Sequence, residues 1–429
     1  MTSSTDTEPP RATMARAAGG AVSPGLARVL AGLALVATTA AAAALLDRFT
    51  DALPHWLPDY ATWQAGAYSQ AGDFLHWWIG DTSEAQFYKS GIGSLGMLAG
   101  AWIAHVAWKR SRRWAGFPIS YGTGLWPWLL ASALLGLLLS DIAWGWTLPA
   151  TGAWQPTFVP FVSVPPAVVL IYGAGWTVAA TGAVLGAALT TPIALLVVNY
   201  VCVPLDLPSV IGNVTGMWAG ALLAFLLCRY LPWLPRPLTS QNSETSDAPG
   251  HAGQEDATAG DQEASARARQ GPFWVVRRVL ADFTEPQFYG NEIASIGLIG
   301  GTVLTYLLNP LTPVYGTGLL PAVLTAQFLT ATVGVLLYQR RWAAAGWYPT
   351  FVPVVSVAPA TVLTYGATVP AVIVGAVLGA LAAPPLAAWI SKRLPADFHP
   401  FIGNVISMAI CTLAIVPLLG TLPGFTTAS

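Results

Sequence analysis

The chain has 429 residues, of which 54% are hydrophobic and only 9% are charged, and its mean hydropathy is +0.57. A soluble domain carries about 25% charged residues, so this composition excludes an ordinary soluble globular protein. The net charge of −1 gives no support to nucleic-acid binding, and the three cysteines show neither metal-ligand spacing nor a disulfide framework. Apolar runs of about 17–25 residues can each cross a bilayer, which predicts an all-α integral membrane protein with about eleven transmembrane helices.

The N-terminal region contains an apolar run at 26–46 that follows several arginines. The run is about 21 residues long, longer than the h-region of a signal peptide, and no clean small-residue cleavage site follows it. We therefore interpret it as a retained extra transmembrane helix, with a cleaved signal peptide as the alternative. Residues 1–25 are then a cytoplasmic tail, and residues 47–80 an extracytoplasmic loop rich in acidic residues and tryptophan.

Two long stretches of the chain are copies of one another. PTFVPFVSVPPAVVLIYG at 156–173 recurs as PTFVPVVSVAPATVLTYG at 349–366. Shorter matches flank this pair in the same order: DTSEAQFY at 81–88 with DFTEPQFY at 282–289, YGTGL at 121–125 with 315–319, and IGNV at 211–214 with 402–405. Such an internal repeat indicates duplication. We predict a first five-helix repeat over 81–231, called the first copy below, and a second over 271–429, called the second copy.

Each copy contains five apolar segments. They span 91–108, 125–146, 157–172, 176–202 and 208–228 in the first copy, and 292–308, 318–338, 350–365, 368–390 and 401–420 in the second. The connection at 232–270 is rich in small and polar residues and is predicted to be a disordered cytoplasmic linker. The stretches 69–88 and 271–289 carry aromatic residues among charges, which favours helices lying along the membrane surface.

Positive charges alternate between equivalent loops of the two copies. The loop 109–113 holds four Lys and Arg residues, whereas its equivalent 309–317 holds none. The loops 149–156 and 203–207 hold none, whereas their equivalents contain Arg340 with Arg341, and Lys392 with Arg393. Since Lys and Arg favour the cytoplasm, the pattern predicts a 5+5 inverted repeat in the cell membrane, with a cytoplasmic N-terminus and an extracytoplasmic C-terminus.

The third segment of each copy, 157–172 and 350–365, is short and broken by proline. Paired segments of this kind in an inverted repeat mark the substrate site of many secondary transporters. Proline frees backbone carbonyls, and these cannot face lipid, so they must face protein or a watery cavity. We predict that a small polar solute binds at Thr157, Pro160, Ser163, Pro166, Tyr172, Thr350, Pro353, Ser356, Pro359 and Tyr365. The alternative is that the prolines only kink the helices for packing.

Five further polar residues are candidates. Asn213 and Asn404 are equivalent residues at the start of the last segments, where they line the transport path or hydrogen-bond a neighbouring helix. Asp141, Glu292 and His105 are candidate proton-coupling groups, because ionisable side chains within spans are costly and usually functional. The alternative places them at the membrane interface. The sequence has no P-loop, HExxH motif or His cluster, so we predict no catalytic residue, metal or cofactor.

The second copy contains a basic, aromatic loop, Gln339-Arg340-Arg341-Trp342, followed by an apolar segment with a central Pro359 and a later Tyr365. This arrangement resembles the threonine/serine exporter family, most fully over 320–390. The family pattern places glycine after the central proline, where this chain has Ala360. The resemblance implies two membrane modules of similar size and proton-coupled export of small hydroxy amino acids or related polar metabolites.

From these observations we expect a secondary transporter of a small polar solute that works by alternating access of two inverted repeats. Its partners would be the solute, protons and the lipid bilayer. The alternatives are a membrane-bound enzyme or accessory subunit of a biosynthetic pathway, and a passive channel.

Overall fold

The computed structural model describes residues 24–147, 156–238, 271 and 273–426, whose regular structure is entirely helical. Eight helices in these ranges are long and apolar enough to cross a membrane, which confirms an all-α membrane protein. They are α1 (Pro24–Phe49), α4 (Gly91–Lys109), α5 (Trp126–Trp144), the helix 176–202, α10 (Ser209–Cys228), α15 (Leu320–Leu337), α18 (Val369–Ser391) and α19 (Phe401–Leu419). Three shorter apolar helices, at 156–172, 292–308 and 352–365, coincide with the other predicted segments.

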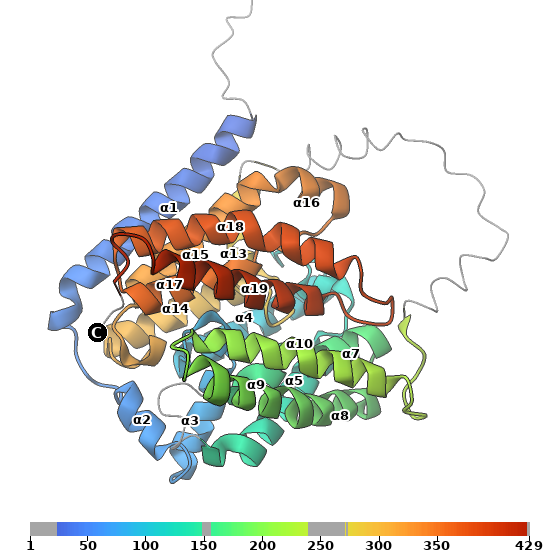
Figure 1. Cartoon of the computed structure of the whole chain (residues 1–429). Coiled ribbons are helices and arrows are strands. Elements are labelled where there is room, and N and C mark those ends of the chain that lie inside the picture. The colour runs from blue at the N-terminus through green and yellow to red at the C-terminus, as the bar shows by residue number, and fades with distance from the viewer. Residues whose placement is uncertain (1–23, 148–155, 239–270, 272, 427–429) are drawn as a thin grey trace, which may run out of the picture.

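The helices of each copy pack with equivalent neighbours. In the first copy, α5 packs against α7 (Val164–Tyr172) and against α8 (Trp176–Leu185), which continues through a π-turn into α9 (Thr191–Val197). In the second copy, α15 packs in the same way against α17 (Val357–Tyr365) and α18. Helices α10 and α19 pack against each other and join the two groups. In Figure 1 the group of the first copy lies below that of the second.

Helix α4 packs along α14 (Glu292–Leu308) at glycines. A Cβ atom on Gly96 would collide with the carbonyl oxygen of Gly297, and one on Gly297 would collide with that of Gly96. Gly93 lies beside Gly301 and Gly100 beside Ile293, so the two helices run antiparallel. Small residues let the backbones approach this closely, and van der Waals packing then holds the pair together.

The proline-broken segments have matching geometry. A tight helical turn, η5 (Pro156–Val162), precedes α7, and a similar turn, η9 (Val352–Val355), precedes α17. Both breaks fall at a serine whose backbone is neither helical nor extended, Ser163 and Ser356. Their hydroxyls donate to the carbonyl oxygens of Val159 and Val352, at 2.5 and 2.7 Å. Each serine therefore satisfies a carbonyl that lies four residues before it in the broken helix.

Two acidic turns lie in the interior. The first acidic turn, residues 81–90, follows α3 (Ala71–Asp81), and the second, residues 282–291, follows α13 (Trp274–Asp282). All side chains of both turns are buried except the half-buried Ala85. The prediction of surface helices is wrong for these turns, because their charged groups pair with one another and can leave water together.

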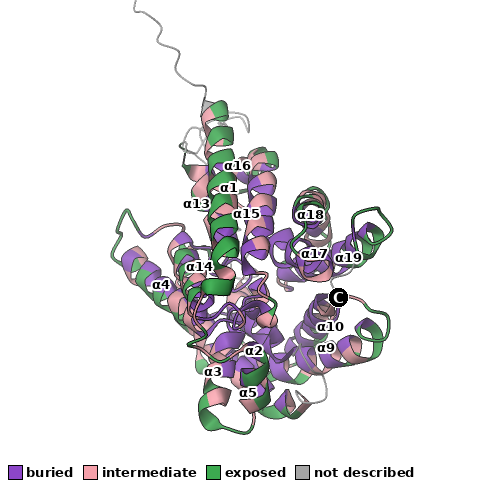
Figure 2. Ribbon diagram, turned by 90° about the vertical axis from the view of Figure 1, so that its left-hand side faces the viewer, coloured by how far each residue is buried: buried purple, intermediate pink, exposed green. Residues whose placement is uncertain are grey.

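The region before the first copy forms two features. Helix α1 packs against α13 and α15 and leaves its outer face exposed, as Figure 2 shows. The strap, residues 53–68, includes α2 (Tyr60–Gly66) and is bonded to the second copy. The backbone N–H groups of Trp56 and Tyr60 donate to the carbonyls of Leu308 and Leu311, at 2.9 and 2.8 Å. Most of the predicted tail 1–25 and linker 232–270 lies outside the described residues.

Candidate functional site

A cavity of about 210 Å³ lies between the two copies. Most of its lining comes in equivalent pairs, one residue from each copy. The pairs are Glu84 and Glu285, Ala85 and Pro286, Phe87 and Phe288, Phe158 and Phe351, Val162 and Val355, Val210 and Phe401, Asn213 and Asn404, Val214 and Val405, and Met217 and Met408. Tyr121, Trp347, His399 and Pro400 complete the wall. The two copies therefore contribute almost equally to one central chamber.

The two asparagines predicted from the sequence, Asn213 and Asn404, both line this cavity. Both are at least 96% buried. Within the described part of the chain, neither polar atom of the Asn213 amide has a hydrogen-bond partner, and neither has the Asn404 Oδ1 atom. Buried polar atoms are almost always satisfied in native proteins, so these amides can bond to polar groups inside the cavity, either of water or of a ligand.

The proline-broken segments reach the cavity through apolar residues, Phe158 and Val162 from one copy and Phe351 and Val355 from the other. The polar residues predicted there lie elsewhere. Pro160, Ser163, Pro166, Tyr172, Pro353, Ser356, Pro359 and Tyr365 are buried in helix packing and are absent from the lining. Thr157 and Thr350 donate instead to carboxylates of the acidic turns, Asp81 at 3.2 Å and Asp282 at 3.1 Å. These threonines therefore bond to the acidic turns and do not line the cavity.

The first acidic turn is neutralised by Lys89. Its ammonium group pairs with Asp81, lies 3.9 Å from the Oε2 atom of Glu84, and sits 3.5 Å from the centroid of a Trp77 ring. All three charged groups are buried. Burial raises the pKa of Glu84 to about 8. Burial also lowers the pKa of Lys89, whereas the negative charge of Asp141 raises it. The turn thus holds charges that are expensive to maintain without water.

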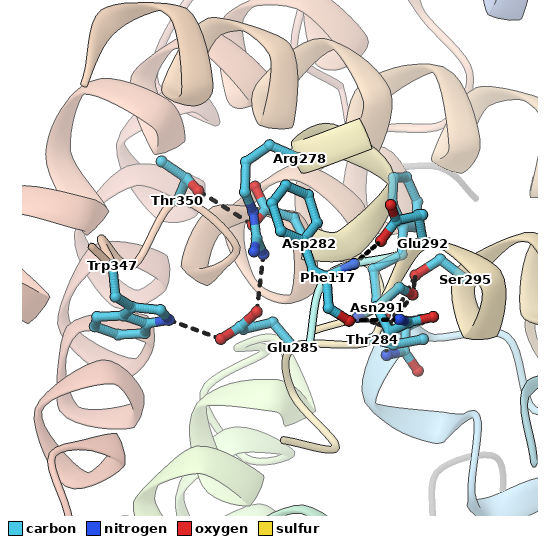
Figure 3. Close-up of polar contacts among 12 residues, drawn as sticks. Phe117, Arg278, Asp282, Thr284, Glu285, Asn291, Glu292, Ser295, Trp347 and Thr350 are labelled. Carbon is cyan, nitrogen blue, oxygen red and sulfur yellow. Dashed lines mark hydrogen bonds and ion pairs between the residues drawn. The ribbon is translucent and has the colours of Figure 1, made fainter. Parts of the chain in front are cut away.

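The second acidic turn is neutralised by Arg278 (Figure 3). The guanidinium donates to Asp282 at 2.6 Å and to Glu285 at 2.8 Å. Trp347 donates from its indole nitrogen to the other oxygen of Glu285 at 2.7 Å. Burial raises the pKa of Asp282 to about 6, while Arg278 acts in the opposite direction. Glu285 is therefore well compensated, in contrast to Glu84.

A pair of glutamines joins the two turns. The Nε2 atom of Gln86 donates to Oε1 of Gln287 at 2.8 Å, and Nε2 of Gln287 donates back to Oε1 of Gln86 at 2.9 Å. Each amide also donates to a backbone carbonyl of the other turn, that of Phe283 or Thr82. The sequence analysis did not select these residues, although the repetition of Glu and Gln at equivalent positions was a visible signal.

The three proton-coupling candidates lie apart from one another, and none lines the central cavity. Asp141, buried in α5, accepts a hydrogen bond from the Tyr68 hydroxyl of the strap at 3.0 Å. Glu292 pairs with Arg277 at 2.7 Å and accepts from the backbone of Phe117, also at 2.7 Å. His105 is buried in α4 with its ring 5.1 Å from that of Trp126.

A larger cavity of about 650 Å³, here called the vestibule, adjoins the central one. The two share Tyr121, Glu285 and Trp347 in their linings. Arg278 lines the vestibule, whereas its equivalent in the first copy, Trp77, is buried beneath the strap. Tyr60 of the strap packs on Trp77 and on Tyr315, with ring centroids 5.9 and 5.7 Å apart. The strap thus covers the position that is hollow in the second copy.

No protein-family model matches this sequence, and no curated protein matches it significantly. Among the described residues, no group of three or more His, Cys, Asp or Glu side chains could hold a metal ion. Any assignment of function therefore depends on the geometry of the central cavity and its two acidic turns.

Proposed function

We propose that the protein is a secondary transporter whose small solute binds in the central cavity. The observation that carries this proposal is the composition of the cavity wall, to which the two copies contribute equivalent residues. A site between two equivalent half-structures can open to either side when the halves exchange conformations. The wall also combines apolar surface with a few convergent polar groups, as small-molecule sites do.

The architecture that we propose is a 5+5 inverted repeat with an extra N-terminal helix, eleven spans in all. The antiparallel packing of α4 and α14 and the reciprocal contacts of Gln86 with Gln287 support inversion. The vestibule is lined from the loop after α4 and from the residues after Arg341, both on the predicted cytoplasmic side. In the cell membrane, with the N-terminus inside and the C-terminus outside, this arrangement corresponds to a cavity that communicates with the cytoplasm.

Proton coupling is the mode of transport that we propose. Glu84 and Glu285 both line the cavity, and a carboxyl group that changes protonation there would couple solute movement to protons. The resemblance to the threonine/serine exporter family supports export by antiport, with an amino acid or related metabolite as the first solute to test.

The proposal is tested by flux into and out of proteoliposomes, with and without an imposed pH gradient. The solute panel contains serine, threonine, other amino acids and small amines. We expect one class of solute to move with the gradient, and Asn213→Leu to reduce that movement at least tenfold by filling the cavity. Asn199→Leu is the matched control, since Asn199 lies on the preceding helix and does not line the cavity. A folded protein that moves no solute would favour the enzyme or accessory-subunit alternative.

A further inference from the structure

The walls of the central cavity suit a ligand with an apolar body. Five phenylalanines from both copies line it together with two methionines: Phe87, Phe158, Phe288, Phe351 and Phe401, with Met217 and Met408. The volume of about 210 Å³ exceeds the roughly 150 Å³ of an engineered cavity that binds benzene. One aromatic ring with a short chain therefore fits. The faces of the phenylalanine rings also attract cations.

Glu84, on the first acidic turn, is less well compensated by cations than its equivalent Glu285. Glu84 is 98% buried, and its Oε2 atom has no hydrogen bond within the described structure. Its nearest cation, Lys89, pairs more closely with Asp81 and also interacts with Asp141. One ammonium group thus serves three carboxyl groups. Glu285, by comparison, is held by both Arg278 and Trp347.

The unpartnered amides supply a second, independent indication of a ligand. A purely apolar molecule would leave the Asn213 amide without hydrogen bonds, which is unfavourable for a buried polar group. A ligand with N–H groups would satisfy the oxygen atoms of Asn213 and Asn404. The same N–H groups would suit a carboxylate that lacks a close cation.

We propose that the central cavity binds an organic cation with an apolar body, of the arylalkyl-ammonium class, and that this cation replaces a proton on Glu84. The inference rests on the proposed transport function and narrows its solute. The phenyl ring lies among the phenylalanines, and the ammonium group lies between Glu84 and the two asparagines. One proton leaves the Glu84 carboxyl group for each cation that binds, so the charge of the cavity does not change.

The pH dependence follows from the surroundings of Glu84. Burial raises its pKa to about 8, although a hydrogen bond with Tyr315 acts in the opposite direction. The groups that face it are Lys89 on its own turn, Tyr60 and Tyr315 behind it, and Glu285, His399 and Tyr121 along the same cavity. Burial lowers the pKa of His399 to about 3, which leaves that ring neutral. Cation affinity should therefore rise about tenfold per pH unit up to roughly pH 8.

The test is calorimetric titration of the purified full-length protein with phenethylammonium, in buffers of different ionisation enthalpy. We expect release of about one proton per bound cation at pH 6.5, and at least tenfold weaker binding of 2-phenylethanol, which has the same size and no charge. Glu84→Gln should abolish both proton release and pH dependence. Asp206→Asn is the control, since Asp206 is exposed before α10 and lies outside both cavities, and it should behave as the unaltered protein does.

Equal affinity for 2-phenylethanol, tighter binding of threonine, or proton release that persists in Glu84→Gln would each overturn the inference. The comparison of phenethylammonium with 2-phenylethanol uses the unaltered protein, so it decides the question even if Glu84→Gln fails to fold. Flux of another solute without cation binding would overturn the cation inference and still support the transport function. Cation binding without flux in proteoliposomes would contradict transport and leave the binding site.

Discussion

The two acidic turns carry the same acids but take their cations from different positions. In the first turn the cation is Lys89, and Trp77 lies four residues before the turn. In the second, Arg278 stands at the position equivalent to Trp77, and Gly290 at the position equivalent to Lys89. A Cβ atom on Gly290 would contact the Glu285 carboxylate, which would have to shift from its bonds to Arg278 and Trp347. The constraint on each copy is therefore one buried cation beside two acids, whatever its place in the chain.

A second difference concerns what surrounds the turns. The first copy has Asp141 in α5, whereas the equivalent residue of the second copy is Val335. The hydroxyl partner of Asp141 comes from Tyr68 of the strap, which precedes the first copy and packs over its turn. The strap and Asp141 thus form one asymmetric addition to a duplicated frame. This asymmetry leaves the second turn, and not the first, facing a vestibule.

The largest loss of stability should arise at the glycine contact between α4 of the first copy and α14 of the second. Gly297→Val places a side chain against the backbone of α4 at Gly96, and neither backbone can move aside without separating the helices. We expect no folded, monodisperse protein in detergent, as measured by size-exclusion chromatography and thermal unfolding. Gly300→Val on the same helix is the control, because nothing lies within 4 Å of a Cβ atom there. Normal folding of both variants would contradict close packing of α4 with α14.

The next effect concerns the two cations. Arg278→Met leaves Asp282 and Glu285 buried without a positive charge, which should lower the free energy of unfolding by about 3–5 kcal/mol. Lys89→Met should cost a similar amount in the first turn. Thermal unfolding at fixed pH measures both.

The exchanged position of the cation gives a sharper version of the same prediction. The double variant Trp77→Arg, Lys89→Gly gives the first turn the cation of the second at the equivalent position, so it should be more stable than Lys89→Gly alone. If the double variant is less stable than Lys89→Gly alone, an arginine at position 77 cannot replace Lys89, and the cation positions of the two turns are not interchangeable.

The smallest effect tests the asymmetric addition. Tyr68→Phe removes the hydroxyl that donates to Asp141 and should lower the free energy of unfolding by about 1.5–3 kcal/mol. With Asp141→Val, which copies the second repeat, Tyr68→Phe should have almost no further effect. A double-mutant cycle by thermal unfolding measures this coupling. Additive losses would mean that Tyr68 stabilises the strap by other contacts.

The apolar runs and the duplication were visible in the sequence because each depends on local pattern alone. The same holds for Asn213 and Asn404, which were selected as equivalent polar residues beside a span. Glu84 and Glu285 were not selected as site residues, because their motif favoured a structural role and their place in the cavity wall is visible only in the fold, where Gln86 and Gln287, 201 residues apart, join the two turns. The serines were selected for a ligand, yet each hydroxyl donates to a carbonyl four residues earlier in its own segment.

The reciprocal glutamine contact has an evolutionary consequence. An amide both donates and accepts, so a glutamine can bond an identical glutamine across a two-fold axis, which two glutamates or two lysines cannot do. The glycine contact of Gly96 with Gly297 is equally self-complementary. Such contacts are those of an isologous dimer. If the 5+5 inverted repeat that we propose is correct, a gene encoding a single five-helix unit would have had the residues to assemble with an inverted copy of itself before the two became one chain.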